Sequence, residues 1–364
     1  MFPAILFFLV GLELAYDEKK VQLTISKFKE GILHLKMNNA AYTLIILGVG
    51  GITMINIVPQ AFKFVMFIVF LLFFPGSLYL YFKPNSSRID KGILVVAVLW
   101  IIISAIISTM FTIIAYLGMT IIATLAIKFK ISFFKKLFIF LLLTIFLMNI
   151  QYTKMYVRNE IYHGSKSTTN ELFLKGYLRN FVIIIENIST DKENYSTDIL
   201  FPIYVRINQG RLTSFVLNKF SDEKKIDMGE RLFKTILSSF IPRLFWPNKP
   251  EAGGKVNVKY YADLTTEKAS MNVGPPGEAF GSFGLYGGVL YMFIFGLAIS
   301  SAFMIYINIS YKTPIMILWI PIVFYQSMYS METDTMQAFN SIIKISLFIF
   351  ILFKIRPSLL FYKS

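Results

Sequence analysis

A polar stretch of this chain, residues 151–283, lies between two regions that consist largely of apolar runs. The stretch has ordinary charge density, whereas many of the flanking runs are long enough to cross the hydrocarbon core of a bilayer. The whole chain has 364 residues, is 55% hydrophobic and has a mean hydropathy of +0.61, which is far more apolar surface than a soluble domain needs. The sequence therefore predicts an all-α polytopic membrane protein with one large loop outside the membrane.

About nine apolar segments are predicted to span the membrane. They are Phe2–Tyr16, Ala40–Val58, Phe64–Phe82, Ile93–Ser108, Thr109–Ile127, Phe133–Ile150, Leu285–Ile307, Pro314–Met331 and Ser341–Phe353. The fourth and fifth form one run of about twice the hydrocarbon thickness, so we divide it near Ser108. The chain thus has three predicted parts: about six N-terminal helices (residues 1–150), the large loop (residues 151–283) and about three C-terminal helices (residues 284–364).

The distribution of Lys and Arg predicts the orientation. The net charge of +15 invites a nucleic-acid partner, but many of the cations lie in short loops beside apolar segments, where the positive-inside rule explains them better. The short loops left outside, residues 59–63 and 332–338, are nearly uncharged or acidic. The large loop then lies on the outer side of the membrane. In a bacterium this membrane is the cytoplasmic (inner) membrane. The first segment is short and lacks a cationic start, and a further helix upstream of it would account for both features.

Metal and thiol chemistry have little support in the sequence. The chain has no Cys, which excludes disulfides and thiolate ligands, and its two histidines, His34 and His163, cannot make a histidine-rich metal site. Within the loop, Asp263 and Glu267 are too isolated to predict a divalent cation. We therefore expect no cofactor and no metal requirement.

Two stretches of the loop have the periodicity of amphipathic helices. In Gly229–Phe240 the apolar residues recur at helical spacing, with charged residues elsewhere, which predicts a helix lying in the plane of the headgroups. Glu171–Ile188 has a second such pattern.

Cations with restricted backbones follow the first of these helices. Arg243 follows Pro242 and begins a run that contains Trp246, Lys249 and two further prolines, while Arg206 and Arg211 lie earlier in the loop. A guanidinium donates two parallel hydrogen bonds to phosphate, and nearby proline lowers the entropic cost of holding it in place. The alternative is that these residues contact lipid headgroups or pair with acids of the loop.

The end of the loop is rich in glycine and contains one carboxylate. Gly277, Gly281, Gly284 and Gly288 lie three or four residues apart, which lets helices pack closely. Glu278 lies among them at the predicted outer edge of the membrane, where a partly buried acid can act as a base. Glycine packing alone does not explain this acid.

Together, these motifs resemble a known family. The segment Ile241-Pro-Arg-Leu-Phe-Trp-Pro-Asn-Lys-Pro250, followed by Gly277-Glu-Ala-Phe-Gly-Ser-Phe-Gly-Leu-Tyr-Gly287, resembles the Wzy-type O-antigen polymerases, or oligosaccharide repeat unit polymerases. The resemblance is local and covers roughly residues 206–288. It implies a class C-like glycosyltransferase architecture and, as substrates, undecaprenyl-diphosphate-linked oligosaccharides at the outer face of the membrane. A chain-length regulator protein is a further candidate partner beside membrane lipid.

The residues suit the chemistry that the resemblance implies. The leaving diphosphate needs preorganised cations, for which Arg243 and Arg206 are the catalytic candidates, with Arg211 and Lys249 as further substrate contacts. Glu278 is the candidate base for the attacking hydroxyl, and Trp246 could stack on a sugar ring. An O-antigen ligase-like transferase would need the same residues. A lipid-linked oligosaccharide transporter is a third hypothesis, but it predicts charged residues inside the spans, and these are rare here.

Overall fold

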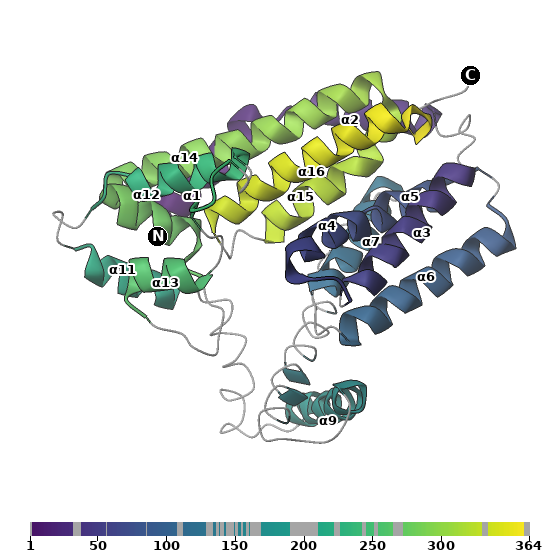
Figure 1. Ribbon diagram of the computed structural model, residues 1–364, viewed down its shortest axis with the longest axis horizontal. Helices are drawn as coiled ribbons and strands as arrows, with labels where there is room; N and C mark the ends of the chain where they lie inside the picture. The colour runs from purple at the N-terminus through teal and green to yellow at the C-terminus, as the bar shows by residue number, and fades with distance from the viewer. Residues whose placement is uncertain are drawn as a thin grey trace. The chain divides into compact units, whose positions relative to one another are not determined.

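A computed structural model of the chain describes residues 2–31, 38–55, 57–84, 86–107, 112–128, 169–189, 210–221, 226–241, 245–250, 254–264, 272–329 and 334–359, with isolated residues between 134 and 160. The described residues form helices joined by turns, and no strand occurs among them (Figure 1). Three of these helices, Phe62–Phe82, Gly274–Lys312 and Thr335–Ile355, are long and apolar enough to cross a membrane. The predicted all-helical class is therefore confirmed for this part of the chain, and the apolar helices are compatible with a membrane protein.

The described residues of the predicted apolar segments are mostly helical. The helices α6 (Arg88–Ile107) and α7 (Thr112–Lys128) lie on either side of the predicted division near Ser108. The predicted segment Phe133–Ile150 falls mostly outside the described residues. Contacts divide the chain into two compact units, which we describe separately. Unit 1 comprises Met1–Gly51, Phe64–Lys91 and Gln209–Ser364, and unit 2 comprises Ile52–Lys63 and Gly92–Asn208.

In unit 1, the helix α1 (Phe2–Ala15) packs closely along α14 (Gly274–Lys312) (Figure 1). Glycine on each helix permits this approach. A Cβ atom on Gly11 would lie 2.2 Å from the carbonyl oxygen of Phe293, and one on Gly296 would lie 2.3 Å from that of Phe8. Small residues at such crossings are typical of helix pairs in membranes, where backbones must come close to gain packing energy.

The helix α14 bends at Gly284. This residue has φ 70° and ψ −165°, a backbone conformation that glycine adopts without steric cost. The helix also begins at Gly274, well before the predicted start at Leu285, because Pro275 and Pro276 occupy its first turn, where proline is tolerated. The glycine-rich end of the predicted loop is therefore helical.

The rest of the C-terminal region forms η3 (Pro314–Trp319), α15 (Ile320–Tyr329) and α16 (Thr335–Ile355). α15 and α16 pack against each other. α16 begins six residues before the predicted segment Ser341–Phe353, since Asp334 caps it by accepting a hydrogen bond from the backbone N–H of Gln337 at 2.6 Å. Hydropathy alone does not detect such a polar first turn.

The N-terminal part of unit 1 includes most of α3 (Asn38–Met54) and α4 (Gln60–Leu71) and all of α5 (Phe73–Phe82). Glycines again lie at the contacts. A Cβ atom on Gly48 would meet the backbone of Phe73 at 2.4 Å. One on Gly76 would meet Leu44 at 2.8 Å.

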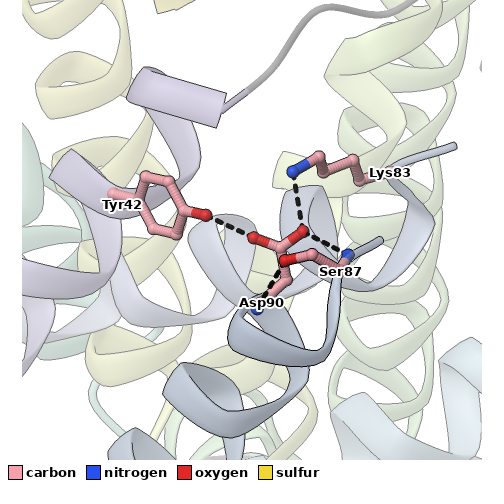
Figure 2. A network of polar contacts seen from close by, with 4 residues as sticks. All are labelled: Tyr42, Lys83, Ser87 and Asp90. Atoms are coloured by element: carbon pink, nitrogen blue, oxygen red, sulfur yellow. Dashed lines mark hydrogen bonds and ion pairs between the residues drawn. The ribbon is translucent and has the colours of Figure 1, made fainter. Parts of the chain in front are cut away.

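A polar cluster fixes the start of α6 to α3 and α5 (Figure 2). Ser87 and Asp90 form a capping box: the Ser87 N–H donates to Asp90 Oδ2 at 2.7 Å, and the Asp90 N–H donates to Ser87 Oγ at 3.1 Å. The Lys83 ammonium donates to the same carboxylate at 2.7 Å, and the Tyr42 hydroxyl donates to its other oxygen. The Lys83 ammonium, followed by the other donors, holds the pKa of the Asp90 carboxyl well below its usual range.

Three short helices of the predicted loop also belong to unit 1. They are α11 (Gly210–Lys219), α12 (Glu230–Phe240) and α13 (Gly254–Ala262). α11, α13 and the start of α14 share a small apolar core that includes Val216, Phe220 and Tyr261. These short helices are therefore packed against the long ones by side chains of their own.

Unit 2 contains most of α6, α7 and the long helix α9 (Thr169–Ser189). α9 confirms the amphipathic helix predicted for Glu171–Ile188. Its apolar residues Leu174, Leu178 and Val182 are more than half exposed, and Phe181 is 43% exposed. Leu172, on the same predicted apolar side, is buried, so this side is largely exposed except at its start, which suits a helix against lipid.

Candidate functional site

The structure describes four of the six predicted site residues. Arg243 and Arg206 lie outside the described residues. Arg211 is exposed in the first turn of α11, and Trp246 is half-buried in the turn after α12. Lys249 and Glu278 are buried, at 8% and 1% exposure.

The predicted amphipathic helix over Gly229–Phe240 is confirmed as α12, and its apolar side faces outward. Phe233, Leu237 and Phe240 lie on one face and are 62%, 53% and 60% exposed. The opposite face is small and polar: Thr235, Ser238 and Ser239 are buried together with Leu232, and this side packs against α14 and α16. A soluble protein would bury the phenylalanines, so this arrangement suits a helix that rests on lipid.

Lys249 closes the C-terminal end of α12. Its ammonium donates to the carbonyl oxygens of Ser238 and Ile241, each at 3.0 Å. These carbonyls belong to the last turn, which has no intrahelical partners for its oxygens. The ammonium predicted to contact phosphate is thus committed to the backbone of α12 in this structure.

Glu278 joins three helices. Its Oε1 accepts a hydrogen bond from Asn257 Nδ2 of α13 at 2.8 Å, and its Oε2 accepts one from the Thr335 N–H at 2.9 Å. The Thr335 N–H is one of the free donors at the start of α16, where the helix dipole favours a negative charge. A substrate hydroxyl could reach this carboxylate only after the network opened, so the predicted base is a buried bridging group in this structure.

Arg231 continues the network to α12. Its Nη2 donates to Asn257 Oδ1 at 3.3 Å, so hydrogen bonds run from Arg231 through Asn257 to Glu278. The guanidinium carbon lies 4.1 Å from the centre of the Tyr260 ring, within cation–π distance. The sequence analysis did not single out Arg231. Its one signal was a guanidinium on the polar side of an amphipathic helix that precedes the cationic run.

Tyr260, whose ring faces the Arg231 guanidinium, is itself held in place. The Tyr260 hydroxyl donates to Asp227 Oδ2 at 2.9 Å, and burial, followed by this hydrogen bond, raises the pKa of Tyr260 to about 12. The phenol therefore stays neutral at physiological pH and offers its ring to the guanidinium. The neighbouring Tyr261 hydroxyl shares a hydrogen bond of 3.0 Å with Ser282 of α14.

Glycine lets α13 approach α14 beside this network. A Cβ atom on Gly281 would lie 2.6 Å from the ring of Tyr261. The predicted close packing at the glycine-rich segment is thus confirmed at Gly281. A small apolar pocket opens at the bend of α14, where Pro3, Leu217, Phe280 and Gly284 are among its lining residues.

The part of the chain that the structure describes holds no group of three His, Cys, Asp or Glu side chains that could bind a metal ion. Metal independence stays a prediction. What the arrangement offers chemically is a half-buried guanidinium, positioned by an aromatic ring and an amide, on a helix whose other side presents apolar side chains outward. Comparison of the chain with protein-family models, with curated proteins and with solved structures gave no match.

Proposed function

We propose that this protein is a membrane glycosyltransferase that polymerises undecaprenyl-diphosphate-linked oligosaccharide repeat units into surface polysaccharide. In this proposal about nine helices cross the bacterial cytoplasmic membrane, and the loop over residues 151–283 works on its outer face. The observation that carries the proposal is the orientation of α12, whose apolar face is exposed while its opposite face connects to a buried polar network.

An enzyme for a lipid-linked sugar diphosphate would use both sides of such a helix, the apolar side to contact lipid and the polar side to bind the charged group. The prenyl chain of the substrate stays in the bilayer, so the enzyme must bind the charged part at the membrane surface. Phe233, Leu237 and Phe240 would rest α12 on the lipid at that level, and cations near the helix would meet the diphosphate. A channel or a protein scaffold has no need for this combination.

The reaction requires one nucleophile and one leaving group. A hydroxyl oxygen of the incoming repeat unit forms a bond to the anomeric carbon of the growing chain, and the bond from that carbon to the diphosphate breaks. The electron pair leaves with the diphosphate, whose charge Arg243 and Arg206 would stabilise, with Arg211 as a further contact. Trp246, half-buried after α12, would stack on a sugar ring.

Two predicted roles need a structural change if they are to operate. Lys249 would have to leave the carbonyls of α12 to reach phosphate. Glu278 would have to leave Asn257 and Thr335 to accept the hydroxyl proton. We therefore assign both residues first to the positioning of α12, α13 and α16, and leave the protein group that accepts the proton open.

The experiment that tests the proposed function is a gel of surface and lipid-linked glycans from a strain without the gene, with and without its restoration. Glycans that stop at a single repeat unit and lengthen again on restoration are the expected result. Polymer of normal length stranded on its lipid carrier would assign the protein to the ligases, and unflipped repeat units inside the cell would assign it to the transporters. An unchanged ladder would refute the glycan function.

A further inference from the structure

Arg231 has an unusual environment for an arginine in a loop. Its side chain is half-buried, its guanidinium lies over the ring of Tyr260, and one of its nitrogens donates to Asn257. Its Nε is buried and has no hydrogen-bond acceptor among the described residues. Burying such a donor without an acceptor costs free energy, so an arrangement of this kind is typical of a site that a ligand completes.

The neighbouring carboxylates are engaged elsewhere. Asp227 accepts from the Tyr260 hydroxyl and from the Gly229 N–H, and Glu230 pairs with Lys234 at 2.5 Å. Glu278 accepts from Asn257 and Thr335, one residue further from the guanidinium. Within the described part of the chain, no carboxylate lies within ion-pair distance of Arg231.

The charge, shape and position of the Arg231 guanidinium indicate which ligand it would suit. It lies on α12, whose Phe233 and Leu237 face outward as a lipid-resting surface would. Arg231 lies on the opposite side of the same helix, about one helix diameter (~10 Å) from that surface, where the diphosphate of a lipid-linked substrate would project from the membrane. Its planar fork suits two phosphate oxygens, and the ring of Tyr260 reduces the motion that binding would have to arrest.

We propose that Arg231 binds a phosphate group of the polyprenyl diphosphate substrate, with Tyr260 and Asn257 as its positioning residues. This inference rests on the proposed function and adds a phosphate contact to it. Through Asn257 the site is linked to Glu278 and to the start of α16, so the bridging carboxylate orients the guanidinium indirectly.

The test measures binding of farnesyl diphosphate, a short prenyl diphosphate, to the full-length protein in phosphatidylcholine nanodiscs. Arg231→Gln removes the fork, and we expect affinity to fall by about tenfold or more, the effect of one lost charge-assisted contact. Arg231→Lys keeps the charge but not the fork and should lose part of the affinity. The control is Lys234→Gln, which removes one charge from the exposed side of the same helix and should leave the affinity unchanged.

Chemical protection gives a second measurement that needs no variant. Bound farnesyl diphosphate should protect Arg231 from modification by phenylglyoxal, read by mass spectrometry, while the exposed Arg179 is modified at the same rate with or without it. Absence of protection at saturating diphosphate would overturn the inference even if Arg231→Gln failed to fold.

The remaining outcomes separate this inference from the proposed function. If the native protein binds farnesyl diphosphate and Arg231→Gln binds it equally well, the inference is wrong and the proposed function stands. If the native protein does not bind the diphosphate, both fail. If phosphatidylglycerol displaces the diphosphate at equal concentration, Arg231 is a site for bulk lipid headgroups and the substrate assignment is overturned.

Discussion

Exchanging the Glu278 carboxylate for an amide puts a hydrogen-bond donor where the network now has only an acceptor. Arg231 donates to Asn257, Asn257 donates to Glu278, and the Thr335 N–H donates to the other oxygen of the same carboxylate. At a pH where Glu278 is ionised, every hydrogen bond points toward it, so the network needs a group that only accepts. The variant Glu278→Gln has the same shape but must place its NH₂ group against a donor.

No rearrangement of the amides removes this conflict. If the new NH₂ group faces Asn257, that side chain must turn its oxygen inward and its own NH₂ group toward Arg231. If the NH₂ group faces Thr335 instead, two N–H groups meet at the start of α16. In either case one buried pair of donors is left without an acceptor, which costs about 1–3 kcal/mol. Since Glu278 is 1% exposed and Asn257 5% exposed, water cannot readily supply the missing acceptor.

A second exchange should restore the network. In the double variant Asn257→Asp with Glu278→Gln, the new aspartate accepts from Arg231 and from the new amide, whose oxygen accepts from the Thr335 N–H. All donors then have acceptors, so the double variant should be more stable than Glu278→Gln alone. Asn257→Asp alone places two carboxylates together in a buried position and should be destabilising.

The assay is thermal unfolding of the four purified proteins in one detergent at one scan rate, which keeps irreversible midpoints comparable. At about 2–4 °C per kcal/mol, Glu278→Gln should unfold several degrees below the native protein. A double variant no more stable than its less stable parent would refute the reasoning. If the double variant regains stability but makes no polymer, Glu278 is the catalytic base after all; if it makes polymer, the role of Glu278 is structural.

Three further predictions concern packing, pH and capping. Gly11→Ala should destabilise the protein by about 1–3 kcal/mol, because the added Cβ meets the Phe293 carbonyl at 2.2 Å; the unfolding midpoint tests this. The native protein should be more stable than Asp90→Asn by a constant amount above about pH 4, and the difference should shrink below that pH. The reason is that the pKa of Asp90 is lowered in the folded protein, so its pairing with Lys83 stabilises the fold above the unfolded pKa of ~3.9. Unfolding midpoints from pH 8 to 3 measure this difference. Lys249→Met should cost about 1–3 kcal/mol and loosen the end of α12, measured by faster amide exchange there.

Matched variants control these experiments. Gly50→Ala adds the same methyl group where nothing lies within 4 Å, so it should be neutral. Lys234→Met removes an ammonium whose side chain is 58% exposed, so α12 should keep its exchange rates. If Gly50→Ala were as harmful as Gly11→Ala, close helix packing would not explain the glycine. If the Asp90→Asn difference grew below pH 4, the sign of the Asp90 coupling would be wrong.

Hydropathy and periodicity were sufficient to predict most of the helices. Helical residues lie on both sides of the predicted division near Ser108, and the two loop stretches with helical spacing are α9 and α12. Helix starts were less predictable. α16 begins at Thr335 because Asp334 caps a polar turn, and α14 begins at Gly274 because prolines fit its first turn. Neither feature changes mean hydropathy, so a search for apolar runs starts both helices too late.

The candidate site was harder to predict for a related reason. The sequence identified Lys249 and Glu278 as charged residues in a suitable segment, but it could not show that other parts of the protein satisfy them. Arg231 was overlooked because its partners, Asn257 and Tyr260, lie on a different helix. A charged side chain can bind a ligand only if its contacts within the folded protein leave a donor or acceptor unused.

The sequence by itself determined that the chain is helical, that several helices are apolar enough for a membrane, and that α12 has one apolar side, because each property depends on residues close together along the chain. Only the tertiary structure decided which helices the polar side of α12 packs against. Periodicity separates the apolar from the polar face of a helix but does not show which neighbours either face contacts. Here Phe233 is exposed and Ser238 is buried. The same contacts decided that Glu278 bridges helices and that the buried Arg231 Nε has no hydrogen-bond acceptor among the described residues, since both depend on α13 and α16 meeting α12 and α14 in space.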